Sequence, residues 1–295
     1  MNVRDRIDED KTVEQMDKPM WFDEIGPCGS ASGFLYSDPH HPMMFIKRRR
    51  PLLMVTFDNL SNVNNREPGR LPWAYKFARD NQVSHLGIYA HLPNWYRDAN
   101  LIEKMQKMAD DGFFEGYDRC IFSGSSMGAF AALTFGRLAP NAHVLAFNPQ
   151  STLNEALVPW ETRYLTGRRQ DWTLPLSDAA DAIAGLERAY VFYDPYFELD
   201  QNHIDRLIAT PGAEDRTFLM KCWFSSHKSA VFLRKIEALK PIMSEALFGD
   251  LTPQSFYTLY RARRRLPWYR GSLSNYFEKS GRPAMAARTT AAFRR

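Results

Sequence analysis

The chain has 295 residues, of which 44% are hydrophobic and 24% charged, and its formal net charge is +4. These values are ordinary for a soluble globular protein that buries a substantial core as one large or two small domains. The charged start lacks the apolar run of a secretory signal or membrane anchor, and no later segment approaches a membrane span, so a cytoplasmic location is expected. Three scattered cysteines, Cys28, Cys120 and Cys222, argue against a disulfide framework or a metal site and are expected as buried thiols.

The first part of the chain predicts a polar arm followed by strands. Residues 1–24 are polar and are expected to form a loose N-terminal arm. Two short strands are predicted at residues 33–36 and 43–46, on either side of a proline-containing turn. Residues 52–57 form a continuous apolar run of the kind buried on both faces of a parallel sheet, and the polar loop 58–62 ends it.

Strand-like and helix-like segments then alternate along the chain. The expected helices are 73–79 and 101–109, and the expected strands are 85–90 and 142–147, with a further strand and helix around residue 126. This alternation predicts an α/β fold with a mostly parallel, twisted sheet and helices on both faces.

The residues around position 126 form a Gly-x-Ser-x-Gly pentapeptide between an apolar strand and a small-residue helix. Its serine is Ser126, and its glycines are Gly124 and Gly128. A strand that turns at once into a helix brings backbone segments very close together, and glycine removes the side chains that would collide there. The pattern predicts a turn that presents Ser126 at its tip.

The alternation of strand-like and helix-like segments is interrupted over residues 151–186, which combine tryptophans, arginines and prolines. We expect this segment to be a cap-like insertion over the carboxyl edge of the sheet. The alternation then resumes, with expected strands at 189–193 and 217–224, an expected helix near 202–208 and one long expected helix over about 229–247. Residues 25–250 thus form the main domain, and residues 251–295 a small, basic helical extension. That extension is expected to be a solvated basic face, and no nucleic-acid partner is expected.

These features resemble the α/β-hydrolase superfamily over about residues 33–247: the order of strands, the turn at Ser126, and a later aspartate and histidine. The resemblance implies the chain order serine, acid, histidine. His227 follows the last expected strand, on the edge where Ser126 must lie, whereas His203 falls inside a helix-like stretch and suits packing or solvent. An alternative for His227 is that it only caps the next helix.

Two aspartates are candidates for the acid. Asp194 ends a strand, and with Pro195 it also suits a turn. Asp200 lies about 27 residues before His227, which is closer to the separation usual in the superfamily, but it also suits a helix N-cap. Asp200 is narrowly preferred.

The resemblance assigns a role to each residue. His227 would remove the proton of Ser126 during attack, and the carboxylate would hold the imidazole in the correct tautomer. The backbone N–H of Met127 would bind the developing oxyanion. The second donor would come from the loop at residues 58–60, where Asn59 is the candidate, through either its backbone or its side chain.

The implied function is cleavage of an ester or related acyl bond through an acyl-serine intermediate, on a small-molecule or glycan acyl ester. Two alternatives stay open: an acyltransferase with the same triad, and a non-catalytic protein that keeps the fold. The sequence indicates no cofactor and no metal. It leaves the substrate and the oligomeric state open.

Overall fold

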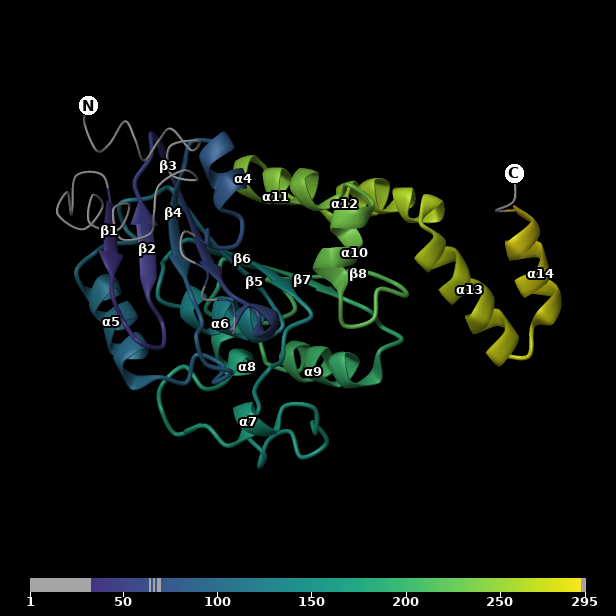
Figure 1. Ribbon diagram of the computed structural model, residues 1–295, viewed down its shortest axis with the longest axis horizontal. Helices are drawn as coiled ribbons and strands as arrows, with labels where there is room; N and C mark the ends of the chain where they lie inside the picture. Colours follow the sequence, from purple (N-terminus) through teal and green to yellow (C-terminus); the bar gives the residue numbers. More distant parts are fainter. Residues whose placement is uncertain (1–32, 64, 66, 68–69, 293–295) are drawn as a thin grey trace.

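The computed structural model describes residues 33–292, except residues 64, 66, 68 and 69, so the expected arm at 1–24 and Cys28 lie outside the described residues. In the described part, eight strands form one sheet in the order β1-β2-β4-β3-β5-β6-β7-β8 (Figure 1). Strand β2 runs antiparallel to both of its neighbours, and every pair from β4 to β8 is parallel. The strands are β1 (Gly33–Tyr36), β2 (Met43–Ile46), β3 (Arg50–Phe57), β4 (Val83–Ile88), β5 (Arg119–Ser125), β6 (Ala142–Phe147), β7 (Arg188–Tyr193) and β8 (Thr217–Lys221).

This order, with only the second strand reversed, is that of the α/β-hydrolase fold, so the fold expected from the sequence is confirmed. The apolar runs explain why the strands form where they do. In β3, Val55 and Phe57 lie in one core and Met54 lies in the other, and in β5 Phe122 and Ile121 divide in the same way. A strand buried on both faces needs apolar residues at successive positions, because side chains alternate between the two faces.

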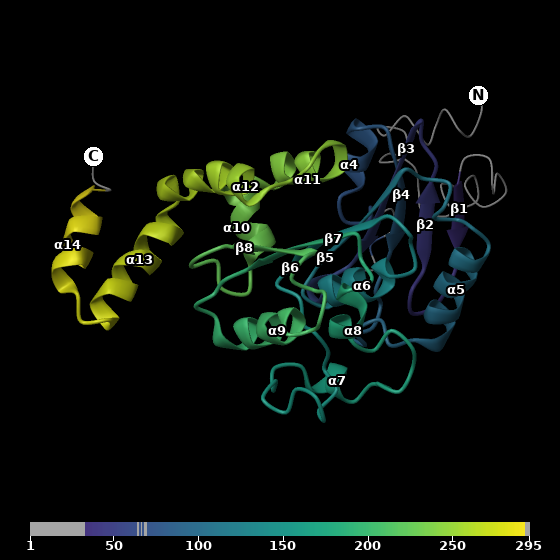
Figure 2. The same cartoon turned by 180° about the vertical axis from the view of Figure 1, so that it is seen from behind.

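Helices cover both faces of the sheet (Figures 1 and 2). One core packs residues of α5, α6, α8 and α9 against the sheet, and the other packs residues of α4, α10, α11 and α12. The helices of the main domain are α4 (Tyr75–Asp80), α5 (Ala99–Asp110), α6 (Met127–Gly136), α7 (Leu165–Arg168), α8 (Ala179–Ile183), α9 (Glu198–Ile208), α10 (Ser229–Lys235) and α11 (Leu239–Phe248), with a 3-10 turn η2 (Leu60–Asn62) after β3.

The structure corrects three expected boundaries. The single helix expected over 229–247 is two helices, α10 and α11, and Glu237 between them has a φ of 60°. Pro241 gives the physical reason, since proline has no N–H to donate and its ring clashes with the carbonyl four residues earlier, so it is tolerated only in the first turn of α11. Helix α9 begins at Glu198 rather than near 202, and β8 ends at Lys221 rather than at 224.

The C-terminal part is helical, with α12 (Pro253–Tyr260), the 3-10 turn η3 (Arg261–Arg265), α13 (Pro267–Lys279) and α14 (Pro283–Ala292). Helix α12 lies beside β8, where the Tyr257 hydroxyl accepts a hydrogen bond from the Lys221 N–H and the Tyr260 hydroxyl donates to the Trp223 carbonyl. Helices α13 and α14 extend away from the sheet (Figures 1 and 2). In the described residues, no helix has both the length and the apolar character needed to cross a membrane.

Candidate functional site

Ser126 lies at the turn between β5 and α6, with a φ of 54° and a ψ of −117°. Non-glycine residues rarely adopt a positive φ, and such strained residues cluster at functional sites. A Cβ atom on Gly124 would lie 2.3 Å from the carbonyl carbon and oxygen of Gly128, so the two glycines of the motif allow the strand and helix to touch. The turn expected from the sequence is present in the structure.

The start of α6 also touches the end of β3. A Cβ atom on Gly128 would lie 2.6 Å from the carbonyl oxygens of both Phe57 and Asp58. The loop after β3 therefore lies beside the first turn of α6, next to Ser126. Within that loop, Asp58 forms an ion pair with Arg70 at 2.7 Å and accepts a hydrogen bond from the Ala90 N–H, which fixes the end of the strand.

The structure brings Ser126, His227 and Asp200 together in one hydrogen-bonded chain. His227 Nε2 lies 2.8 Å from Ser126 Oγ, and His227 Nδ1 lies 2.7 Å from Asp200 Oδ2. Because a carboxylate accepts hydrogen bonds, the ring carries its proton on Nδ1, which leaves the lone pair of Nε2 facing the serine hydroxyl. His227 precedes the N-cap of α10, which is Lys228, so capping is not its role.

Two further side chains hold the Asp200 carboxylate, which is fully buried in the first turn of α9. Arg163 Nη1 donates to Asp200 Oδ1 at 2.9 Å, and Asn148 Nδ2 donates to Asp200 Oδ2 at 3.0 Å. Asn148 also accepts a hydrogen bond from the Ser229 N–H at 2.7 Å, so the residue after β6 ties the acid to the loop that carries His227. The N-cap of α9 is Phe197, not Asp200.

Asp194, the second candidate for the acid, has different partners. Its carboxylate accepts hydrogen bonds from the backbone N–H of Ser226 at 2.7 Å and from that of Tyr196 at 3.0 Å. Burial raises the pKa of Asp194 above its ordinary value, despite these hydrogen bonds. Asp194 therefore fixes the backbone immediately before His227, and the geometry favours Asp200 as the acid.

The two residues expected to bind an oxyanion lie at the start of α6 and after β3. Met127 is the first residue of α6, where a backbone N–H has no partner within the helix and the helix dipole favours negative charge. The side-chain oxygen of Asn59 accepts hydrogen bonds from the Ser61 N–H at 2.9 Å and the Ser61 hydroxyl at 2.6 Å. This oxygen caps η2, which leaves the Asn59 backbone N–H and the N–H groups of its side-chain amide as candidate donors.

A buried ionic network links the insertion to Asp200. Glu161 is fully buried, forms an ion pair with Arg163 at 2.6 Å and lies 3.1 Å from His203 Nε2. Burial acts to raise the pKa of Glu161, but the hydrogen bonds of His203 and Arg163 outweigh it and hold the pKa at about 2. His203 Nδ1 accepts from the Ser151 N–H, and burial lowers its pKa, so His203 packs as a neutral ring away from Ser126.

Glu161→Gln should lower the free energy of unfolding by about 2 kcal/mol, because it removes one of the two carboxylates that pair with Arg163. Urea unfolding of the purified protein measures this loss. The matched control is Glu155→Gln in the same insertion: Glu155 is 77% exposed and pairs with Arg168, so its loss should cost less than about 1 kcal/mol. Equal effects of the two substitutions would contradict the structural role of the network.

Tyr164 is a residue of the site to which the sequence assigned no role at Ser126. Its hydroxyl lies 3.0 Å from His227 Nε2. Its ring packs 4.7 Å from that of Trp95, and the guanidinium of Arg163 lies 5.0 Å from its centre. The only signal in the sequence was the mixture of aromatic residues and arginines in the insertion.

Two arginines near the site, Arg163 of the insertion and Arg97 of the loop after β4, pair with groups of the protein itself. Arg163 pairs with two carboxylates, and Arg97 donates to the carbonyl oxygens of Leu174, Pro175 and Leu176. Burial lowers the pKa of Arg97 to about 10, which still leaves it charged at neutral pH. Arg97 therefore anchors the insertion to the loop after β4, and neither arginine is free to bind an anionic group of a substrate.

Several proteins of known structure align with this one at low identity. They are a capsule O-acetyltransferase of Neisseria meningitidis serogroup A (13% identity, 70% of this chain and 93% of that chain, TM-score 0.47), a bacterial heroin esterase (13%, 83% and 90%, 0.46) and a putative esterase from Staphylococcus aureus (13%, 82% and 94%, 0.49). No protein-family model and no curated protein sequence matches this chain. At these levels of similarity, function has to be argued from the site itself.

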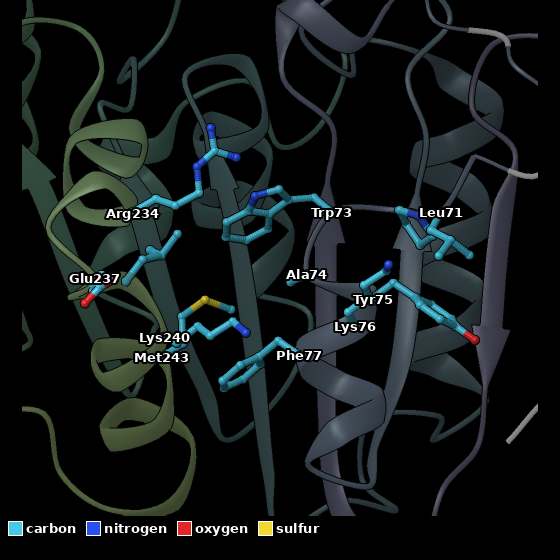
Figure 3. A pocket seen from close by; sticks show the side chains of 12 residues that line it. Leu71, Trp73, Ala74, Tyr75, Lys76, Phe77, Arg234, Glu237, Lys240 and Met243 are labelled. Atoms are coloured by element: carbon cyan, nitrogen blue, oxygen red, sulfur yellow. The ribbon is translucent and has the colours of Figure 1, made fainter. Parts of the chain in front are cut away.

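A separate groove of about 660 Å³ lies between α4 and the pair α10 and α11. Figure 3 shows Trp73 and Phe77 on one side, facing Arg234, Lys240 and Met243 on the other. None of the three residues of the hydrogen-bonded chain lines it. In the described part of the sequence, no cluster of histidine, cysteine and acidic side chains could hold a metal ion, and Cys120 and Cys222 are buried free thiols.

Proposed function

We propose that the protein is a serine esterase that cleaves an acyl ester through a covalent acyl-Ser126 intermediate. Ser126 is the nucleophile at a nucleophile elbow, His227 is the general base, and Asp200 orients and stabilises the histidine. The single observation that carries this proposal is the chain of hydrogen bonds from Ser126 Oγ through both nitrogens of His227 to Asp200.

Acylation follows from this geometry. A serine hydroxyl is a weak nucleophile at neutral pH, and His227 Nε2, at 2.8 Å, is within reach of its proton. As Oγ bonds to the carbonyl carbon, negative charge develops on the carbonyl oxygen, and the N–H of Met127 and the backbone N–H of Asn59 are the proposed donors to it. His227 then gives its proton to the departing alcohol, which leaves the acyl group on Ser126.

Deacylation repeats these steps with a new nucleophile. His227 Nε2 removes a proton from water, the oxygen attacks the acyl carbon, and the proton returns to Ser126 Oγ as the acid leaves. Within this proposal, residues 151–186 act as a cap, since Arg163 and Tyr164 reach Asp200 and His227 from that segment. A small-molecule or glycan acyl ester is the proposed substrate class.

A fluorophosphonate probe tests the proposal, because it phosphonylates only serines that a neighbouring base activates. The wild-type protein should be labelled, whereas Ser126→Ala and His227→Ala should lose the label. The matched control is Ser123→Ala. Ser123 lies in β5, the strand that leads to Ser126, but its hydroxyl donates to the Leu145 carbonyl in the core. Ser123→Ala should therefore keep the label.

A folded wild-type protein that takes no label would overturn the proposal and favour a non-catalytic binding protein on this fold. Circular dichroism and thermal melting of each variant establish that the protein tested is folded. Labelling that survives in Ser126→Ala would place the reactive residue elsewhere and equally contradict the assignment.

A further inference from the structure

Two hydroxyl groups compete for one nitrogen atom of His227. Ser126 Oγ lies 2.8 Å from Nε2, and the Tyr164 oxygen lies 3.0 Å from the same atom. A neutral imidazole whose Nδ1 carries the proton has a single lone pair, on Nε2, and that lone pair accepts one strong hydrogen bond at a time. Only one of the two hydroxyls can therefore donate to it.

The competition is resolved when Ser126 becomes acylated, which is why this inference rests on the proposed function. The ester oxygen of an acyl-serine has no proton to donate, so Tyr164 is then the hydroxyl left beside the lone pair. We propose that Tyr164 occupies the position on His227 that a hydrolytic water must take, and that it thereby delays hydrolysis of the acyl-enzyme and favours transfer of the acyl group to a bound alcohol.

Tyr164 is held in this position by its surroundings. The ring is packed against Trp95 and lies under the guanidinium of Arg163, which is itself tied to Glu161 and Asp200. Burial raises the pKa of Tyr164 above its ordinary value, so at neutral pH the phenol keeps its proton and acts as a donor. The Tyr164 hydroxyl can therefore donate to His227 Nε2 in the acyl-enzyme without a change in the protonation of either residue.

Water and an alcohol differ in what they can offer to displace Tyr164. A water molecule brings only its own hydrogen bonds, about as strong as the one it must replace. In this proposal an acceptor alcohol such as a sugar would also contact the site through the rest of its body, and that binding energy would displace the tyrosine at the moment of reaction. The arrangement therefore selects against the small nucleophile.

The transfer step balances without any further reactant. His227 Nε2 takes the proton of the acceptor hydroxyl, whose oxygen bonds to the acyl carbon, and the bond from that carbon to Ser126 Oγ breaks. The proton returns from His227 to Ser126 Oγ. The products are the new ester and the free enzyme, whereas the same sequence with water gives the free acid.

Pre-steady-state hydrolysis of p-nitrophenyl acetate measures the two steps separately. The wild type should show a burst of about one nitrophenolate per active site followed by slow turnover, because deacylation limits the rate. Tyr164→Phe keeps the ring and removes the hydroxyl that competes for Nε2, so its burst should reach the same amplitude at an equal or faster rate, and its steady-state turnover should rise roughly tenfold. The matched control is Tyr36→Phe in β1, which should leave both phases unchanged.

The possible outcomes separate this inference from the proposed function. A burst in the wild type with unchanged or slower turnover in Tyr164→Phe overturns the role of Tyr164 alone, as does a slower burst, which would make the hydroxyl a donor to the transition state. Turnover that depends on Ser126 but shows no burst also overturns it, because deacylation would not be limiting. If wild type and Ser126→Ala release nitrophenolate equally, the proposed function itself fails.

Discussion

Asp200→Asn should lower kcat for p-nitrophenyl acetate by about 10³ to 10⁴ and leave KM nearly unchanged. An asparagine of the same shape can turn its amide N–H toward His227 Nδ1, which then has to accept, and Nε2 would carry the proton instead of receiving that of Ser126. The hydrogen bonds that hold the carboxylate come from Arg163 and Asn148, and both donate. Arg163 donates to one carboxylate oxygen and Asn148 to the other, so the amide nitrogen of an asparagine would face one of these donors, and the imidazole also loses its fixed orientation.

Asp194→Asn is the control that separates the two candidate acids. Both Asp194 oxygens accept from backbone N–H groups, so an asparagine there places its amide nitrogen against a donor and should lower the melting temperature. The folded fraction should keep kcat within about tenfold, since no step of the chemistry uses Asp194. If the larger loss of kcat occurred at Asp194, the acid would have been assigned to the wrong residue.

Gly128→Ala should cost several kcal/mol of unfolding free energy and lower kcat by at least about 10². The added Cβ would lie 2.6 Å from two backbone carbonyl oxygens, those of Phe57 and Asp58, and neither can rotate away as a side chain could. The clash has to move the loop after β3 away from α6. That movement would separate Asn59 from Met127, the two proposed oxyanion donors. Urea unfolding and steady-state kinetics measure the two effects.

The control for this substitution is Gly271→Ala in α13, where an added Cβ meets no atom within 4 Å. Alanine is the better helix former, so this variant should be more stable by up to about 1 kcal/mol and fully active. A Gly128→Ala protein that behaves like the control would show that the contact between β3 and α6 is not required.

Local patterns predicted most of the fold. Residues 43–46 are apolar at every position and residues 142–147 at every position except His143, and these two runs form β2 and β6 with the expected bounds. The turn at Ser126 was predictable because it requires two glycines around a strained residue, and five consecutive residues of the sequence meet that requirement. His227 could be placed because it follows the last parallel strand, and the carboxyl ends of parallel strands meet at one edge.

The remaining features of the site depend on contacts between distant segments. Arg163 and Asn148 meet at Asp200 from two separate loops, and no local pattern encodes that meeting. For the same reason the sequence could not decide firmly between Asp194 and Asp200, since both are polar residues after a strand. The role of Tyr164 needed the path of the insertion, a segment that lacks the periodicity on which sequence-based prediction depends.

The contact of α12 with β8 has a consequence for the sheet as a whole. Among the strands of the described residues, β8 is the last in the order and has β7 as its one neighbour, so its outer side is an edge of the kind that recruits strands from other molecules. The Tyr257 hydroxyl accepts a hydrogen bond from the Lys221 N–H of β8, and the Tyr260 hydroxyl donates one to the carbonyl of Trp223, just after the strand. Helix α12 therefore satisfies backbone groups at the end of β8 and covers part of this edge, so a chain shortened before α12 would leave these groups without their tyrosine partners.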